Sequence, residues 1–194
     1  MKKVLVIIVS MVYLATYSAV ANAYYLSGKV WTSTASAKTP YAFTGNYPSS
    51  LVSAASSGNL AWDSLSGSSL NTGSLTYTPS SNIYANAAFK LSYQNVKTLT
   101  GMDVPGATFA IAGSNTASVY LNSTWTWGTS FDQTNKKAVA RTVLTHEFGH
   151  AHGLDHPALG GPMTTAEIAS VMNATYSVKN TPNSDDIAGI AAMC

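Results

Sequence analysis

One short segment, LTHEFGHAHGLDHP at residues 144–157, contains all four histidines of this chain and one of its two glutamates. Imidazole is the commonest metal-ligating side chain, and a nearby carboxylate can accept a proton during catalysis. Only 9% of the residues are charged. This concentration of ionisable groups therefore indicates a site that performs chemistry.

The spacing of the histidines predicts a metal site built on a helix. His146 and His150 are four residues apart within 135–152, a segment whose apolar pattern predicts a helix. At 3.6 residues per turn both rings project from one face and can hold one ion. Gly153 can adopt a positive φ and end the helix, so that His156 can return to the same ion. Three neutral histidines leave zinc an open fourth position, which is typical of a catalytic site.

Glu147 follows the first histidine and is the predicted general base. It would deprotonate a water that attacks a carbonyl carbon and then pass the proton to the leaving amine. Zinc would polarise the carbonyl and lower the pKa of the water to about 7. A bare H-E-x-x-H also occurs by chance, but the complete H-E-x-x-H-x-x-G-x-x-H present here is far more specific.

Two ionisable neighbours are not expected to bind the ion. His152 lies about 240° around the helix from His146, so we predict a packing or surface role for it. Asp155 precedes the third histidine. It either orients that ligand or is a solvated loop acid.

The chain begins with a predicted signal peptide, residues 1–23. Two lysines precede an apolar run, Val4–Leu14, and Ala21-Asn22-Ala23 forms a small-residue cleavage site. The alternative, a membrane anchor, needs about 20 apolar residues, more than this run supplies. We therefore expect a secreted protein, extracellular or periplasmic, with no membrane association after cleavage. A short lysine-led signal peptide is typical of bacteria.

The rest of the chain is nearly neutral and has one cysteine. Removing residues 1–23 leaves eight Lys/Arg and eight Asp/Glu, so nothing indicates nucleic-acid binding. Cys194 excludes an intrachain disulfide, because it has no partner. It is either a fourth ligand that closes a structural zinc site or, as we predict, a small buried side chain.

Hydrophobic patterning predicts one domain of the α+β or mixed α/β class over residues 24–194. Strands are expected at 39–44, 88–93, 107–112 and 117–122, with a weak candidate at 74–78. Helices are expected within 49–65, over 135–152 and from Ser184, a predicted N-cap, to the end of the chain.

The zinc motif resembles the metzincin protease signature, whose Met-turn methionine would here be Met172. Among metzincins, GKVW at 28–31, VYLNSTWTW at 119–127 and NSDDIAGIAAM at 183–193 resemble segments of matrixin catalytic domains. The resemblance implies a twisted, five-stranded mixed sheet. It also implies an active-site helix, a C-terminal helix, an upper part over about 24–153 and a small lower part over about 154–194.

The resemblance also implies how substrate is held. An extended peptide would lie along an antiparallel edge strand, here 107–112, and add a strand to the sheet. Met172 would form an apolar base beneath the zinc. Tyr176 would contribute to the wall of a substrate pocket, although the proline that usually stands two residues before it is replaced by Ala174.

Two aspartates on the last helix would support the site. By the same resemblance, the new α-amine of Tyr24 pairs with Asp185, while Asp186 bonds the backbone near Met172. The alternative is that Asp185 only complements the helix dipole and pairs with no specific group.

The sequence also departs from the matrixin pattern. No histidine remains for a second, structural zinc, so we expect one catalytic Zn²⁺, and the scattered acids leave calcium binding open but unsupported. No upstream cysteine is present to cap the zinc, so we expect activity on secretion unless a separate protein inhibitor restrains it.

The function predicted is a secreted zinc-dependent endopeptidase. Two alternatives remain, namely a zinc-binding or adhesive module without turnover and a zinc hydrolase of non-peptide amides or esters. Glu147 favours an enzyme, because a structural site has no use for a general base.

Overall fold

The computed structural model describes residues 25–26, 41–44, 46–63, 65, 89–110, 116–157, 163–175 and 177–193. The predicted signal peptide, the strand candidate at 74–78, Tyr176 and Cys194 lie outside these residues. No helix in the described ranges is long and apolar enough to cross a membrane.

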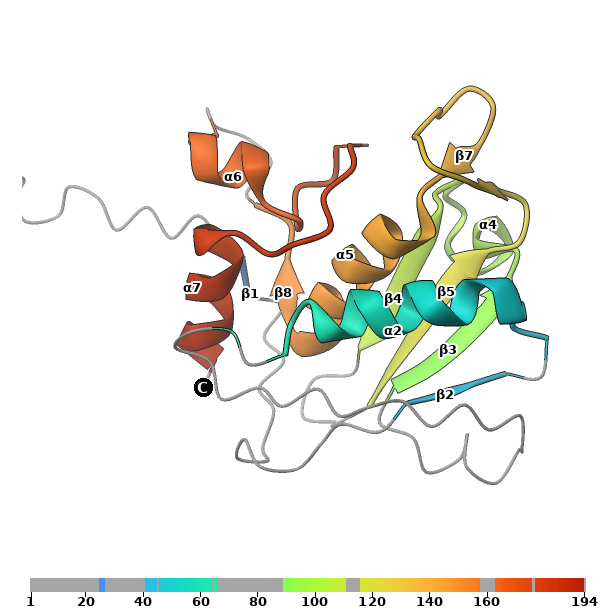
Figure 1. Ribbon diagram of the computed structural model, residues 1–194, viewed down its shortest axis with the longest axis horizontal. Helices are drawn as coiled ribbons and strands as arrows, with labels where there is room; N and C mark the ends of the chain where they lie inside the picture. Colours follow the sequence, from blue (N-terminus) through green and yellow to red (C-terminus); the bar gives the residue numbers. More distant parts are fainter. Residues whose placement is uncertain are drawn as a thin grey trace, which may run out of the picture.

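A mixed sheet forms one side of the molecule (Figure 1). Its strands in spatial order are β2 (Tyr41–Phe43), β3 (Phe89–Gln94), β5 (Ala117–Asn122) and β4 (Gly106–Ala110). β2, β3 and β5 are parallel, and β4 is antiparallel to β5 with Thr108 opposite Val119. The mixed α/β class agrees with the sequence prediction. The predicted count of five strands is not confirmed, because the described residues place four in this sheet.

Two helices cover the sheet and enclose the core. α2 (Val52–Leu60), preceded by the 3₁₀ turn η1 (Ser49–Leu51), packs against α5 (Ala140–His152), and α5 also contacts β4 and β5. The Trp62 indole, just beyond α2, donates a hydrogen bond of 2.8 Å to the Thr145 carbonyl oxygen. The side chain of Phe148, a residue of α5, is fully buried in the core. The helix that carries the zinc motif is therefore fixed on two sides.

The predicted start of this helix at residue 135 is wrong. Lys137–Ala138 form a short strand, β7, beside β6 (Thr126–Trp127), and Val139 is extended before α5 begins. The Thr126 amide donates to the Lys136 carbonyl oxygen at 2.7 Å. The apolar residues before 140 are therefore used in strand pairing rather than in a helical turn.

The chain after α5 forms a smaller end of the molecule (Figure 1). The elements there are β8 (Leu154–Asp155), α6 (Thr165–Ala169) and α7 (Ser184–Met193), with β1 (Tyr25–Leu26) paired antiparallel to β8. A short helix, α4 (Val96–Thr100), precedes β4 at the other end.

α7 spans the segment predicted for the last helix, but its cap differs. Asn183, rather than Ser184, accepts hydrogen bonds through Oδ1 from the amides of Asp185 (2.9 Å) and Asp186 (3.1 Å). Serine is a favoured N-cap, but asparagine ranks equally and here stands one residue earlier.

Candidate metal centre and active site

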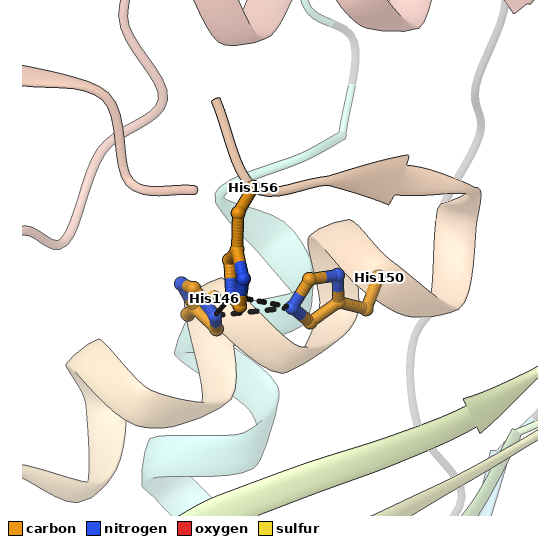
Figure 2. A group of neighbouring side chains, drawn as sticks. All are labelled: His146, His150 and His156. Carbon is orange, nitrogen blue, oxygen red and sulfur yellow. Dashed lines mark hydrogen bonds between the residues drawn. The ribbon is translucent and has the colours of Figure 1, made fainter. Parts of the chain in front are cut away.

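Three histidine rings converge on one point (Figure 2). His146 and His150 project from α5, and His156 approaches from the segment after β8. The Nε2 atoms lie 3.0 Å apart for His146 and His156, 3.1 Å for His146 and His150, and 3.2 Å for His150 and His156. The structure thus brings together the three predicted ligands.

The turn after α5 makes this convergence feasible. Gly153 has φ of 110°, in the left-handed region that a side chain disfavours, and its amide donates to the carbonyl oxygens of Gly149 (3.1 Å) and His150 (3.0 Å). The helix ends within one residue, and β8 carries the chain back toward His156. Any other residue at Gly153 would strain this reversal.

Backbone carbonyls orient the two helical rings. Nδ1 of His146 lies 2.8 Å from the Val171 carbonyl oxygen, and Nδ1 of His150 lies 2.8 Å from that of Leu154. A carbonyl can only accept, so each ring carries its proton on Nδ1 and presents a lone pair on Nε2. The Asp155 carboxylate accepts a 2.7 Å bond from the backbone amide of His156, so it holds the chain at this residue.

The environment keeps the three rings neutral. Burial lowers the pKa of His146, His150 and His156, that of His150 to about 4. For His146 and His150, like-charge repulsion with a neighbouring ring contributes to this lowering after burial.

A three-nitrogen donor set of this kind fits zinc. Two nitrogens bound at about 2.0–2.1 Å to one tetrahedral ion lie about 3.3–3.4 Å apart. The Nε2 separations of 3.0–3.2 Å are close to this value. The residues present therefore suit Zn²⁺ with its fourth position open.

Glu147 is buried on α5 and contacts the edge strand. Its Oε2 atom accepts a hydrogen bond of 2.7 Å from the Thr108 hydroxyl, whose oxygen also lies 3.0 Å from the Glu147 carbonyl oxygen. Burial raises the pKa of Glu147 to about 7, against the opposing effect of the Thr108 bond. A carboxylate with this affinity for a proton can both take one up and release it near neutral pH.

Met172 packs against α5, the helix that carries the zinc motif. It is 2% exposed, and a Cβ atom at Gly149 would overlap its sulfur and approach the Trp62 ring. The glycine inside the zinc motif thus lets α5 approach Met172 closely. Close packing against Met172 therefore explains the glycine at position 149, which zinc binding itself does not require.

Asp186 holds the segment around Met172. Its carboxylate accepts hydrogen bonds from the Ser170 hydroxyl (2.5 Å) and from the amides of Val171 (3.0 Å) and Asn183 (2.8 Å). Val171 is also the residue whose carbonyl orients His146. α7 is therefore connected to the histidine cluster through one buried carboxylate.

Asp185 is buried without a cationic partner in the described part of the chain. Burial, and to a smaller extent the nearby charges of Asp186 and Glu167, raise its pKa to about 6. Such a carboxylate is destabilising when ionised unless a positive charge is supplied.

His152 lies apart from the cluster, in the core. Its ring packs against Trp62 and Phe89, with centroid separations of 6.2 Å and 5.2 Å. The helical periodicity predicted a packing or surface role, and the structure shows packing in the core.

A cavity of about 570 Å³ runs past the three histidines and Glu147. Its walls include Gly106–Phe109 of β4, one face of α5, and Val171, Asn173, Ala174, Thr175, Ser177 and Lys179. Tyr176, the predicted pocket residue, lies outside the described residues.

The sequence analysis missed two residues of this site, Thr108 and Val171. Thr108 follows the strand alternation of β4, and Val171 acts through its backbone carbonyl. No sequence signal identifies either, because each acts through a contact between segments far apart in the chain.

Comparison with known proteins identifies the family. The model of the matrixin family, Peptidase_M10, matches residues 35–194, and the chain belongs to this family of zinc metallopeptidases. A search of curated proteins finds no match. One similar solved structure, "GM1 bound form of the ECX AB5 holotoxin", shares 15% identity over 89% of this chain and 84% of that chain, with a TM-score of 0.48.

Proposed function

We propose that this protein is a secreted zinc-dependent endopeptidase in which His146, His150 and His156 hold one zinc ion and Glu147 is the general base. The observation that carries the proposal is the convergence of three neutral Nε2 atoms beside a buried carboxylate in an open cleft. Bound zinc supplies a Lewis acid that polarises a carbonyl and lowers the pKa of water to about 7.

The protein's own groups would move the proton. Glu147 takes a proton from the attacking water on a carboxylate oxygen and later delivers it to the leaving amine nitrogen. Met172 packs against Gly149 of α5, and Asp186 fixes the backbone that orients His146.

The edge strand offers a place for an extended peptide. β4 is the outermost strand of its sheet, so one row of its backbone groups has no partner among the described strands. An extended chain can pair with such an edge. Thr108 and Phe109 both line the cavity, which would bring a paired peptide next to Glu147.

Incubation of the zinc-loaded protein, residues 24–194, with a proteome-derived peptide library tests this function. We expect cleavage within peptides that a chelator stops and added zinc restores. Zinc binding with no cleavage of any peptide would favour a binding module. Hydrolysis of small esters or amides alone would favour a non-peptide hydrolase.

Thr108 is expected to position Glu147 during turnover. Thr108→Val removes a hydrogen bond to an ionisable group, worth about 1.5–3 kcal/mol, so we expect kcat to fall about tenfold or more. KM and zinc content should stay near their wild-type values. Steady-state kinetics with metal analysis measures this.

Thr108→Ser is the matched control, because it keeps the hydroxyl and loses only a methyl group. Recovery of kcat in the serine variant is the expected result. Equal losses in both variants would mean that the threonine acts only through packing.

For Asp185 we propose pairing with the α-amine of Tyr24 after signal-peptide removal. β1 pairs with β8, and α7 contacts β8, which brings the start of the mature chain toward the last helix. In a protein starting at Tyr24, Asp185→Asn should lower Tm by about 2–4 °C at pH 7, as expected for the loss of about 1 kcal/mol.

The same change has the opposite effect when the amine is displaced. With extra residues before Tyr24, Asp185 keeps a pKa of about 6, above its ordinary 3.8, so its stabilising protonation is lost as pH rises through 6. Asp185→Asn should then raise Tm at pH 7 and change it little at pH 4. Equal Tm shifts in both forms would refute the pairing.

A further inference from the structure

We propose that Lys179 makes this protein prefer peptide substrates that carry an aspartate or glutamate within two residues of the cleaved bond. This inference rests on the proposed peptidase function. Lys179 is the only lysine or arginine among the described residues that line the cavity.

The ammonium group of Lys179 has hydrogen-bonding capacity to spare. It donates one bond of 2.7 Å to the Ile168 carbonyl oxygen, and an ammonium has three N–H groups. Within the described ranges, no carboxylate lies within 4.0 Å of it. The charge of Asp186 acts on it, but the oxygens of Asp186 already accept bonds from Ser170 and two backbone amides.

Partial burial makes this unpaired cation receptive to an anion. Lys179 is half-buried, and the loss of hydration lowers its pKa. A carboxylate from a substrate would restore the interactions that water no longer supplies. An acid would therefore gain more here than at a fully exposed lysine.

The position of Lys179 limits which substrate residue it can meet. Lys179 lines the same cavity as His146 and Glu147. The next residue, Asn180, accepts a 2.6 Å bond from the hydroxyl of Thr142, which fixes this segment beside the first turn of α5. An extended peptide advances about 3.3 Å per residue, so the reach of Lys179 covers the one or two residues beside the reacting bond.

The two ends of the cleft consequently carry opposite charges. Asn180, the residue after Lys179, lies beside the start of α5, whereas Asp155 lies beyond its end, and the ten residue steps from Thr142 to His152 span about 15 Å. A substrate acid near Lys179 is thus well separated from the carboxylate of Asp155. This arrangement favours an acid at one side of the reacting bond only.

A peptide that the wild-type protein cleaves provides the test. It is resynthesised with Glu, Gln or Lys at each of the two positions on either side of the cleaved bond, and kcat/KM is measured. At one position we expect Glu to be preferred over Gln about three- to tenfold, as for a partly screened ion pair, and less so at high salt.

Variants of Lys179 separate charge from structure. Lys179→Met should abolish the preference, Lys179→Arg should keep it, and Lys179→Glu should favour the Lys peptide. Lys97→Met, which removes an exposed lysine of α4 outside the cavity, is the matched control and should leave the preference intact. If Lys179→Met slows all three peptides alike, the lysine only tethers its loop to Ile168 and the inference is wrong.

A binding measurement keeps this test independent of turnover. Zinc-loaded Glu147→Gln is titrated with the Glu and Gln peptides, and the Glu peptide should bind several-fold more tightly unless Lys179 is also replaced by Met. Cleavage without an acidic preference in either assay would overturn the inference and leave the peptidase function standing. If wild type cleaves no peptide, the proposed function fails, and this inference, which rests on it, fails with it.

Discussion

Replacing Glu147 by glutamine should lower kcat/KM for peptide hydrolysis by about 10²–10⁴-fold, the usual contribution of a general base. Glutamine keeps the side-chain volume and can still accept the 2.7 Å bond from Thr108, but it cannot take up a proton. Fold and zinc content should be unchanged. Steady-state kinetics, metal analysis and thermal unfolding measure the three quantities.

The second glutamate of the chain supplies a matched control. Glu167 caps α6 through reciprocal bonds with Thr164 and does not line the cavity. Glu167→Gln makes the same chemical change there and should leave kcat/KM near the wild-type value. Comparable activity in Glu147→Gln and the wild type would remove Glu147 from the mechanism.

Replacing His150 by alanine should abolish stoichiometric zinc binding, and peptide hydrolysis with it. Loss of a group that only orients a ligand typically costs about 10–100-fold in metal affinity, so loss of a ligand should cost more. One of the three converging nitrogens disappears, and the two that remain are 3.0 Å apart. Zinc titration against a competing chelator gives the affinity directly.

His152 distinguishes ligation from packing within the same helix. It is buried against Trp62 and Phe89 rather than directed at the other three rings. His152→Gln should lower Tm but retain about one zinc per chain, whereas His150→Ala should lose the metal. Full zinc occupancy in His150→Ala would refute the ligand assignment.

The sequence alone determined the positions that local geometry controls. A spacing of four residues places His146 and His150 on one helical face whatever surrounds the helix. A glycine three residues later permits the left-handed turn that is observed at Gly153. The family likeness likewise depends on this motif and on residues 119–127 and 183–193, all of which the matrixin match covers, whereas GKVW at 28–31 lies before the matched residues.

Local patterns failed where two structures compete for the same residues. The apolar residues before 140 suit a helix as well as a strand, and pairing of β7 with β6 decided the outcome. Asn183 and Ser184 are equally good caps by residue type, and in the structure the side chain of Asn183 accepts the hydrogen bonds from the first amides of α7.

Only the tertiary structure decided what surrounds the candidate catalytic groups. The hydroxyl of Thr108 reaches Glu147 across 39 residues of chain, and the carbonyl of Val171 reaches His146 across 25. The cationic side of the cleft depends on a bond between Thr142 and Asn180, which are 38 residues apart. Such contacts leave no periodic pattern in the sequence, because they arise from how β4, α5 and α7 pack. The spacing of the histidines, in contrast, is set within a single helix and the turn that ends it.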